Sequence, residues 1–290
     1  MNLFDDINKR VNNDNIGVDF FCLYPFTTEN INGYLPYFEL KGKSLLTVGS
    51  SCDQAINACI AGCDDITVYD ICPLTKYFYY LKLVSLLCLN RAEFLSFLCK
   101  TDYKNNRKYN PHLLTKKTFN KVKNILKTID YESYYLWDFI FKNYNRRQIE
   151  RLFRDDINDL AAIIFCNNYL ISDYNYELAR KKLVNTMFSF YVGDISSIKM
   201  NKKFDNIWLS NILQYLSCDG RNQMLKSNID ILEDNGTMLV GYFWNTSMTI
   251  KGFPVEEVLN IGVDKIIIPG TMGNEDKNSI LMYKKSITKK

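Results

Sequence analysis

The stretch "LLTVGSSCDQAINACIAGCDDITVYD", residues 45–70, constrains the fold most strongly, because it has the pattern of a strand, a turn, a helix and a second strand. The first apolar run ends at Val48, and Ser51 or Asp53 can cap a helix whose apolar residues recur at helical spacing. Gly62 is expected to end that helix before the second strand, "DITVYD". Because strands joined by a helix lie parallel in one sheet, this stretch predicts the start of an α/β domain.

The rest of the chain continues this alternation. Pro73 opens a second apolar helix, and β-type runs return from Met187 in "MFSFYVGD", "FDNIWLSN" and "GTMLVGYFW". The last two runs, "VDKIIIP" and "NSILMYKK", are joined by a turn-rich link too short for a crossover helix, so they predict an antiparallel hairpin. We therefore predict a Rossmann-like α/β fold with a mostly parallel sheet, a C-terminal antiparallel hairpin and a large helical insertion.

Changes of pattern along the chain predict three parts. Residues 1–42 form an N-terminal cap segment, residues 43–89 and 183–290 form the Rossmann-like domain, and residues 90–182 form a helical insertion that serves as an acceptor lid. The insertion is expected to consist of amphipathic helices without strands, such as "KKTFNKVKNILKTI" and "RRQIERLFRDDINDLAAIIF".

The insertion also carries a cluster of arginines. Arg147, Arg151 and Arg154 are spaced by four and three residues and are expected near one helical face. A solvated charged helix is the more ordinary interpretation of such a run. The alternative is a lid that grips a carboxylate or phosphate of an acceptor through charge-assisted hydrogen bonds.

Composition excludes several classes of site. The formal net charge is +4, from 36 basic and 32 acidic residues, and gives no reason to favour nucleic acid. The nine cysteines include no CxxC pair and His112 is the only histidine, so neither a zinc site nor a disulfide framework is expected. Because "MNLFDDINKR" does not resemble a signal peptide and no apolar run reaches the length of a membrane span, we expect a reduced, cytoplasmic protein without a transmembrane segment.

The turn after the first strand indicates which ligand the sheet binds. A dinucleotide needs glycines where its pyrophosphate touches the backbone and where the helix meets the strand, and this chain has Ser51 and Gln54 there. S-adenosylmethionine (SAM) has no pyrophosphate, so its loop tolerates side chains more readily. Asp70 follows Gly49 by 21 residues (70 − 49), at a strand end where a carboxylate can accept hydrogen bonds from both ribose hydroxyls. The turn favours a SAM-type nucleoside site. The plainer alternative is that Asp70 caps the helix that begins at Pro73.

The longer stretch "SLLTVGSSCDQAINACIAGCDDITVYDICPLTKYFYYLKL" resembles the start of class I SAM-dependent transferases. Within that superfamily it is most similar to the betaine-lipid-type 3-amino-3-carboxypropyl transferases and their uncharacterised bacterial relatives. Those proteins also have a long helical insertion between the second and third strands, comparable to residues 90–182, and an Asn in an "LSN" context after the fourth strand, as in "IWLSNILQYL". The superfamily resemblance covers residues 40–90 and 185–290.

The resemblance implies a set of cofactor-binding residues. Those in the first loop cradle the methionine portion of SAM, and those after the second strand hold the ribose. After the third strand, an acidic side chain reaches the adenine amino group and an apolar one packs on the ring. The positions are Gly49, Ser50, Ser51 and Asp53 in the loop, Asp70 and Ile71 after the second strand, Asp194 and Ile195 after the third, and Asn211 after the fourth. Asp194 also has a plainer interpretation as a turn former.

The resemblance further implies that Ser210 and Asn211 line the reaction centre. Asn211 can instead cap the helix that continues through "ILQYL". The sulfonium of SAM is already a strong electrophile, so the enzyme mainly has to align an acceptor with the carbon that moves. If a base is needed, Glu29 in the polar cluster "TTEN", Asp53 or a tyrosine can serve. The candidate catalytic residues are therefore Asn211, Glu29 and Ser210.

Together these residues predict a SAM-dependent transferase. It moves a 3-amino-3-carboxypropyl group, which the resemblance favours, or a methyl group to a small-molecule or lipid-like acceptor. Two alternatives stay open. One is an NAD-dependent oxidoreductase, which the missing glycines disfavour. The other is a catalytically silent SAM-fold binding module, because a fold alone never proves activity.

Overall fold

The computed structural model of the chain describes residues 3–12, 21–100, 110, 112–154, 159–195, 200–244, 262–271 and 273–286. The chain divides into two compact units. The first unit comprises Met1–Thr27, Gly49–Cys52 and Asp70–Ile163, and the second comprises Thr28–Val48, Asp53–Tyr69 and Ile164–Lys290. The polypeptide therefore passes from one unit to the other at the ends of its first two strands.

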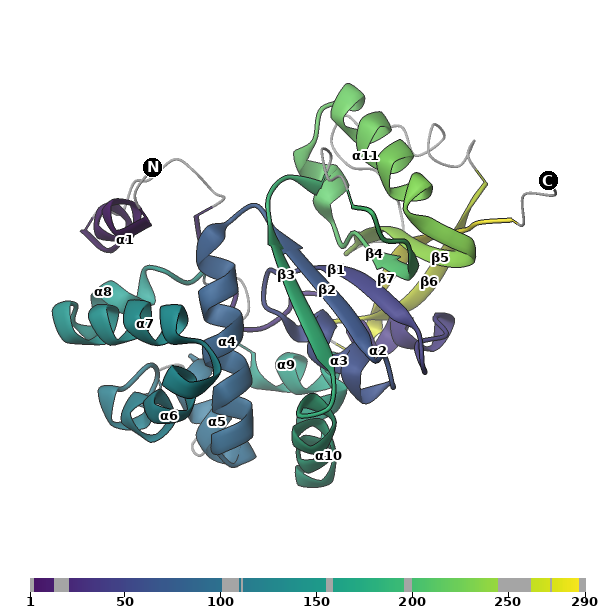
Figure 1. The fold of residues 1–290 in the computed structure, drawn as a ribbon. Coiled ribbons are helices and arrows are strands. Elements are labelled where there is room, and N and C mark those ends of the chain that lie inside the picture. The colour runs from purple at the N-terminus through teal and green to yellow at the C-terminus, as the bar shows by residue number, and fades with distance from the viewer. Residues whose placement is uncertain are drawn as a thin grey trace. The chain divides into compact units, whose positions relative to one another are not determined.

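The second unit is built on a seven-stranded sheet (Figure 1). In chain order the strands are β1 (Ser44–Val48), β2 (Asp65–Asp70), β3 (Met187–Val192), β4 (Phe204–Trp208), β5 (Leu232–Phe243), β6 (Val263–Gly270) and β7 (Gly273–Lys284). Their order in the sheet is β3-β2-β1-β4-β5-β7-β6. β1 pairs in parallel with β2 and β4, β4 pairs in parallel with β5, and β7 runs antiparallel to both β5 and β6. The predicted Rossmann-like sheet with an antiparallel C-terminal hairpin is confirmed.

The strand order reverses beside β1. From β1 the sheet extends through β2 to β3 on one side and through β4 and β5 on the other. Thr47 of β1 is in register with Trp208 of β4, so the chain leaves both strands at the same, carboxyl edge of the sheet. Ligands of such sheets bind beyond that edge, at the point of reversal. The residues that follow β1 and β4 therefore lie where a ligand of such a sheet would bind.

Apolar side chains from the central strands form the core of the second unit. Leu45–Val48 of β1 are all buried, as is typical of a parallel strand covered on both faces. Ile207 of β4 and Met238 of β5 belong to the same cluster, to which helix α11 (Cys218–Asp230) adds Met224. This packing fixes the strand ends from which the candidate residues project.

Further helices of this unit precede the first strand or lie between strands along the chain. They are α2 (Ile31–Tyr34), η1 (Leu35–Tyr37), α3 (Asp53–Ile60), η2 (Asn168–Leu170), α10 (Asp173–Leu183) and η4 (Ile212–Tyr215). Helix α9 (Leu160–Cys166) has residues in both units. Helix α3 is buried along its whole length, including its polar residues, which therefore need hydrogen-bond partners inside the protein.

The described part of the first unit is helical. Its helices are α1 (Leu3–Asn12), α4 (Pro73–Cys88), α5 (Arg91–Leu98), α6 (Lys116–Ile129), α7 (Tyr131–Asn143) and α8 (Arg146–Glu150). Helices α6 and α7 pack against α4 (Figure 1). Asn90 and Glu93 form a capping box at the start of α5, and Trp137 of α7 is fully buried and donates to the backbone oxygen of Tyr77 at 2.9 Å. The large helical insertion expected from the sequence is thus present.

The segment 146–165 departs from the sequence prediction. Its expected amphipathic helix ends at Glu150, residues 151–154 are not helical, and the next helix of the described residues is α9. Between the two helices the Leu23 N–H donates to the Leu152 oxygen and the Arg154 N–H donates to the Leu23 oxygen, both at 2.8 Å. These tertiary hydrogen bonds take the place of helical ones, so the local periodicity could not reveal the break.

Two of the three arginines of the predicted cluster, Arg151 and Arg154, bind residues near the N-terminal end of the same unit. Arg151 donates to the backbone oxygen of Val11 at 2.9 Å. Arg154 donates to the Tyr24 hydroxyl at 2.9 Å, with its guanidinium 5.5 Å from the centroid of that ring. Because Arg151 and Arg154 lie beyond the end of α8, the prediction of one shared helical face is wrong, and both side chains have structural contacts.

Candidate functional site

The first group of candidate residues lies in the first unit, around the carboxylate of Asp70. Its Oδ2 accepts a hydrogen bond from the backbone N–H of Ser50 at 2.7 Å, and its Oδ1 accepts one from that of Cys72 at 2.8 Å. Burial raises the pKa of Asp70, and hydrogen bonds from the backbone act against that rise. Ile71, the next residue, is 52% exposed. The carboxylate is thus fixed between the turn and the start of α4.

Asp70 is not the cap of helix α4. The N-cap residue is Cys72, which makes no side-chain capping bond, and Pro73 follows at the first turn. Asp70 instead accepts one hydrogen bond from the backbone of the turn after β1 and one from the backbone N–H of Cys72. The plainer interpretation of Asp70 as a helix cap is therefore wrong.

Gly49 allows this close approach. A Cβ at this position would lie 2.8 Å from Thr75 Cγ2 and 2.9 Å from Asp70 Oδ2. The turn closes through a hydrogen bond from the Cys52 N–H to the Gly49 oxygen at 2.5 Å, and Ser50 and Cys52 have φ values of 36° and 65°. Such left-handed residues other than glycine store strain and cluster at functional sites.

A buried lysine that sequence reasoning missed holds the same turn. Lys82 of α4 is fully buried, and its Nζ donates to the backbone oxygens of Ser51 and Pro25, each at 2.8 Å. The same nitrogen lies 4.7 Å from the ring centroid of Phe26. Because a buried ammonium is costly without hydrogen bonds, these contacts fix both backbone segments. The sequence signal is a lysine inside the apolar run "YYLKLV".

The second group lies in the second unit, where Glu29 meets the chain that follows β4. Glu29 is 2% exposed. The Ser210 hydroxyl donates to Oε1 of Glu29, and the Tyr34 hydroxyl donates to Oε2 at 3.3 Å. Burial raises the pKa of Glu29 from its ordinary 4.5 to about 7, against hydrogen bonds from Ser210, Tyr34 and Gln54. This carboxyl therefore exchanges its proton near neutral pH.

A hydrogen-bond network ties the segment that carries Glu29 to three strands. The backbone N–H of Asn30 donates to the Tyr242 hydroxyl of β5 at 2.9 Å, and that hydroxyl donates to Asn278 Oδ1 of β7 at 2.6 Å. The Asn30 side chain donates to the backbone oxygen of Pro269 in β6 at 2.8 Å. Burial raises the pKa of Tyr242, so its hydroxyl stays neutral. The position of Glu29 is thus set by the sheet.

Ser210 and Asn211 follow β4 in a tight backbone conformation. Ser210 has a φ of 56°, and its backbone oxygen accepts from the Tyr242 N–H at 3.0 Å. Asn211 Oδ1 lies 3.3 Å from the Ser210 hydroxyl. Although Asn211 holds the N-cap position of η4, its side chain makes no capping bond there, so the alternative role of helix cap is wrong. The structure brings Glu29, Ser210 and Asn211 together.

Asp53 also belongs to the second unit, where it is fully buried at the start of α3. Its Oδ1 accepts a hydrogen bond from the Tyr169 hydroxyl of η2 at 2.6 Å. One turn further along α3, Asn57 donates to the backbone oxygen of Asp53 at 2.8 Å and to the side chain of Asn167 at 3.0 Å. These contacts join α3 to the segment around η2 and satisfy the buried polar groups of the helix.

The two candidate residues after β3 have different surroundings. Asp194 is exposed. Ile195 is 3% exposed and belongs to the apolar cluster that includes Val48, Tyr69 and Leu209. The side chain of Ile195 is therefore part of the core where the parallel strands end, and that of Asp194 stands at the surface.

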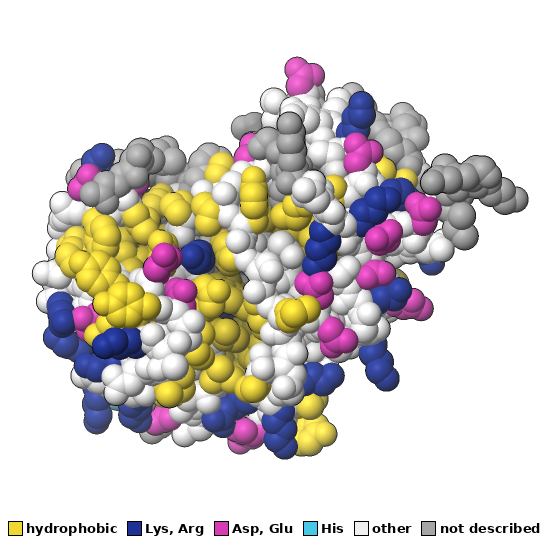
Figure 2. Space-filling model, in the orientation of Figure 1, with side chains coloured by type: hydrophobic (Ala, Val, Ile, Leu, Met, Phe, Trp, Pro, Cys, Tyr) yellow, Lys and Arg dark blue, Asp and Glu magenta, His cyan; other side chains and the backbone are white. Residues whose placement is uncertain are grey.

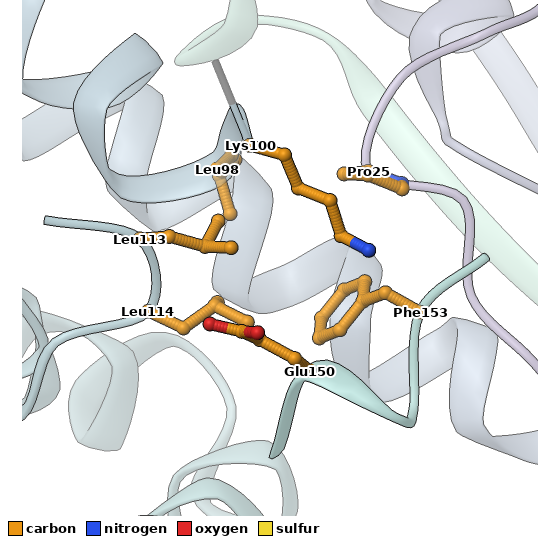
Figure 3. A pocket seen from close by; sticks show the side chains of 7 residues that line it. All are labelled: Pro25, Leu98, Lys100, Leu113, Leu114, Glu150 and Phe153. Atoms are coloured by element: carbon orange, nitrogen blue, oxygen red, sulfur yellow. The ribbon is translucent and has the colours of Figure 1, made fainter. Parts of the chain in front are cut away.

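The first unit contains a small, mainly apolar pocket between the ends of α5 and α8 and the segments that connect its helices (Figure 3). Its lining residues are Pro25, Leu98, Lys100, Leu113, Leu114, Glu150 and Phe153. Burial lowers the pKa of Lys100 and the charge of Glu150 acts against that change, while Glu150 also pairs with Arg146 at 2.6 Å. Such walls suit an apolar group better than a polar nucleoside.

Within the described residues, no three or more His, Cys, Asp or Glu side chains are arranged to hold a metal ion. None of the helices in the described ranges is both long enough and apolar enough to span a membrane.

No protein-family model and no curated protein matches this sequence. Similar solved structures include the N-methyltransferase NodS from Bradyrhizobium japonicum WM9 in complex with S-adenosyl-L-homocysteine (SAH), with 11% identity, a TM-score of 0.43 and coverage of 98% of this chain and 99% of that one. The glycopeptide N-methyltransferase MtfA complexed with SAH has 9% identity, a TM-score of 0.46 and coverage of 98% of both chains. A TehB-like SAM-dependent methyltransferase from Corynebacterium glutamicum ATCC 13032 Kitasato has 11% identity, a TM-score of 0.40 and coverage of 98% of this chain and 95% of that one. At this level of similarity the function has to be inferred from the residues of the chain itself.

Proposed function

We propose that this chain binds SAM and transfers a group from it to a small-molecule or lipid-like acceptor. The observation that supports this most is the carboxylate of Asp70, which is fixed at the end of β2 by the backbone of the turn that follows β1. β1 is the strand at which the sheet order reverses. A carboxylate at this place in a doubly wound sheet is suited to accept hydrogen bonds from the two ribose hydroxyls of a nucleoside.

The turn favours a nucleoside without a pyrophosphate. Ser51 and Gln54 stand where a dinucleotide needs glycines, and both are buried. The backbone oxygen of Ser51 accepts a hydrogen bond from Lys82, and the Gln54 side chain is hydrogen-bonded to Glu29. Because both residues have their own partners, making space for a pyrophosphate would break these contacts, which SAM does not require.

In this proposal the remaining candidate residues contact different parts of the cofactor. The loop residues hold the methionine portion, Asp70 and Ile71 hold the ribose, and the residues after β3 meet the adenine. The loop residues are Gly49, Ser50 and Ser51, with Asp53 acting through the helix that it anchors, and the adenine residues are Asp194 and Ile195.

SAM, when bound, supplies an electrophilic carbon beside its sulfonium, so the chain itself has to orient the acceptor and accept a proton. Glu29 is suited to accept the proton because its pKa of about 7 lies near the working pH. Ser210 and Asn211 present a hydroxyl and an amide beside it, and Tyr34 holds its second oxygen. These residues are the proposed reaction centre.

Titration calorimetry tests the cofactor. We expect SAM and SAH to bind in the micromolar range, equivalent to about −8 kcal/mol, and NAD to bind poorly. Asp70→Ala should weaken SAM binding by about 1.5–3 kcal/mol, the loss expected for hydrogen bonds to a charged group. Asp64→Ala removes an exposed carboxyl next to the opposite end of β2 and should leave the affinity unchanged. NAD binding without SAM binding, or full SAM affinity in folded Asp70→Ala, would contradict the proposal.

We further propose that the group transferred is 3-amino-3-carboxypropyl rather than methyl, on the strength of the sequence resemblance. The two reactions leave different nucleosides, methylthioadenosine in the first case and SAH in the second. Incubating the protein with SAM and a cell metabolite extract, followed by mass spectrometry, separates them. SAH that forms only with protein and acceptor would establish methyl transfer, and neither product across varied extracts would favour a binding module.

A further inference from the structure

Several neutral polar groups of the described residues surround Glu29 inside the second unit. They include Tyr34 of α2, Gln54 of α3, Cys166 of α9, Ser210 after β4 and Tyr242 of β5. Burial raises the pKa of both tyrosines and brings that of Cys166 to about 12, so these three groups stay neutral over the range from about pH 6 to 8. Titration of the cluster in this range is therefore that of Glu29.

The charge of such a carboxyl depends on what binds next to it. With a pKa of about 7, Glu29 holds its proton about half of the time at neutral pH. A cation placed against the carboxyl favours the ionised form and expels the proton, whereas a neutral ligand leaves the proton equilibrium as it was.

We infer that Glu29 distinguishes the cationic substrate SAM from the neutral nucleoside product by pairing, as a carboxylate, with the sulfonium. This inference rests on the proposed function, which puts the reacting carbon near Ser210. During transfer a lone pair of the acceptor forms the new bond to carbon, the carbon–sulfur bond breaks, and its electron pair stays on sulfur. The sulfonium thereby becomes an uncharged thioether. The proton that the acceptor releases then goes to Glu29, whose carboxylate has lost its cation.

The inference predicts different pH dependences for substrate and product. A proton has to leave Glu29 when SAM binds at pH 6, and almost none has to leave at pH 8, so SAM affinity should rise about five- to tenfold between these values. SAH shares the amino and carboxyl groups of SAM and is therefore the reference ligand, and the lower pKa that the sulfonium gives the SAM amine is subtracted from a titration of the free ligands. The affinity for SAH should change by less than about twofold.

The experiment is titration calorimetry at pH 7 in phosphate and in Tris, two buffers whose ionisation enthalpies differ. The ligands are SAM, SAH and sinefungin, an analogue that carries a protonated amine in place of the sulfonium. SAM and sinefungin should each release about half a proton more than SAH. Glu29→Gln should abolish this difference, and Glu39→Gln, which removes an exposed carboxyl of the same unit, should retain it.

Ser210→Ala is a second variant, in which the carboxyl itself is intact. It removes a hydrogen bond that favours the ionised form, so the midpoint of the pH dependence of SAM affinity should move upward. Equal proton release for SAM and SAH, or a difference that survives Glu29→Gln, overturns the inference and leaves the proposed function standing. If neither nucleoside binds the folded protein, the proposed function fails, and this inference fails with it.

Discussion

Asp70 is a half-buried carboxyl and Glu29 a buried one, and the protein holds them in different ways. Asp70, in the first unit, accepts hydrogen bonds mainly from backbone N–H groups, those of Ser50 and Cys72, with a further one from the Thr75 side chain. Glu29, in the second unit, accepts from the side-chain hydroxyls of Ser210 and Tyr34. A backbone N–H can only donate, whereas a hydroxyl can rotate and also accept. The first arrangement suits a permanent anion, and the second suits a group that gains and loses a proton.

This difference shows how burial leads to two outcomes. Desolvation is the largest cause of the raised pKa at both carboxyls. At both carboxyls it prevails over the opposing hydrogen bonds, and at Glu29 it brings the pKa to about 7, close to neutral pH. A ligand that needs a fixed charge, such as a ribose diol, suits the first carboxyl, and one whose charge changes during the reaction suits the second.

The largest expected effect concerns the pH dependence of stability. The pKa of Glu29 rises from 4.5 to about 7 on folding, so its contribution to stability is fully present below about pH 4.5 and is lost as the pH rises through about 7. Glu29→Gln removes this dependence. The free energy of unfolding of the variant should therefore gain about 3 kcal/mol relative to wild type between about pH 4.5 and 7.5. Urea denaturation across this range measures the difference, and a flat difference would make Glu29 an ordinary carboxyl.

The next effect concerns the backbone that holds Asp70. In Gly49→Ala the new methyl group would meet Asp70 Oδ2 at 2.9 Å and Thr75 Cγ2 at 2.8 Å, which forces the carboxylate away from the turn. We expect a loss of about 1–3 kcal/mol in the free energy of unfolding and a weaker affinity for SAM. Gly220→Ala, inside helix α11, is the matched control and should be neutral or slightly stabilising. Unaltered stability and SAM affinity in Gly49→Ala would show that Asp70 does not depend on this turn.

The smallest effect compares two serines with positive φ. Ser50 and Ser210 have φ values of 36° and 56°, so replacement by glycine relieves a similar strain in each, about 1 kcal/mol. Ser50→Gly keeps the N–H that binds Asp70 and should stabilise the protein by about that amount. Ser210→Gly also loses the hydroxyl bonded to Glu29, which should offset the gain at pH 8. Thermal denaturation of both variants tests this, and equal stabilisation would mean that the Ser210 hydroxyl contributes nothing.

The sequence predicts the first carboxyl better than the second for a physical reason. Gly49 and Asp70 end neighbouring strands of one strand–helix–strand unit, so their spacing alone indicates that they lie together. Glu29 and Ser210 are candidates from the sequence as well, but the hydrogen bond between them spans 181 positions. The tyrosines around Glu29 were not found at all, because nothing local distinguishes them from the other tyrosines of the chain.

Tertiary contacts also explain where the local predictions are wrong. The helix expected over residues 146–165 has the right periodicity, yet its backbone pairs with Leu23 after Glu150. Asp53 has the features of a helix cap or a base, but its partner is Tyr169, which is 116 positions away. In both cases a distant segment supplies a hydrogen-bond partner that composition and spacing do not encode, although only the helix prediction is wrong and the proposed role of Asp53 stays a prediction.

The buried ammonium of Lys82 links the evolution of two distant parts of the sequence. It donates to the backbone oxygens of both Pro25 and Ser51, so a shift in either segment leaves a buried donor poorly satisfied. Insertions or deletions close to Pro25 should therefore be as rare among homologues as changes in the turn itself. Where one of the two segments has changed length, the residue at position 82 should have changed with it.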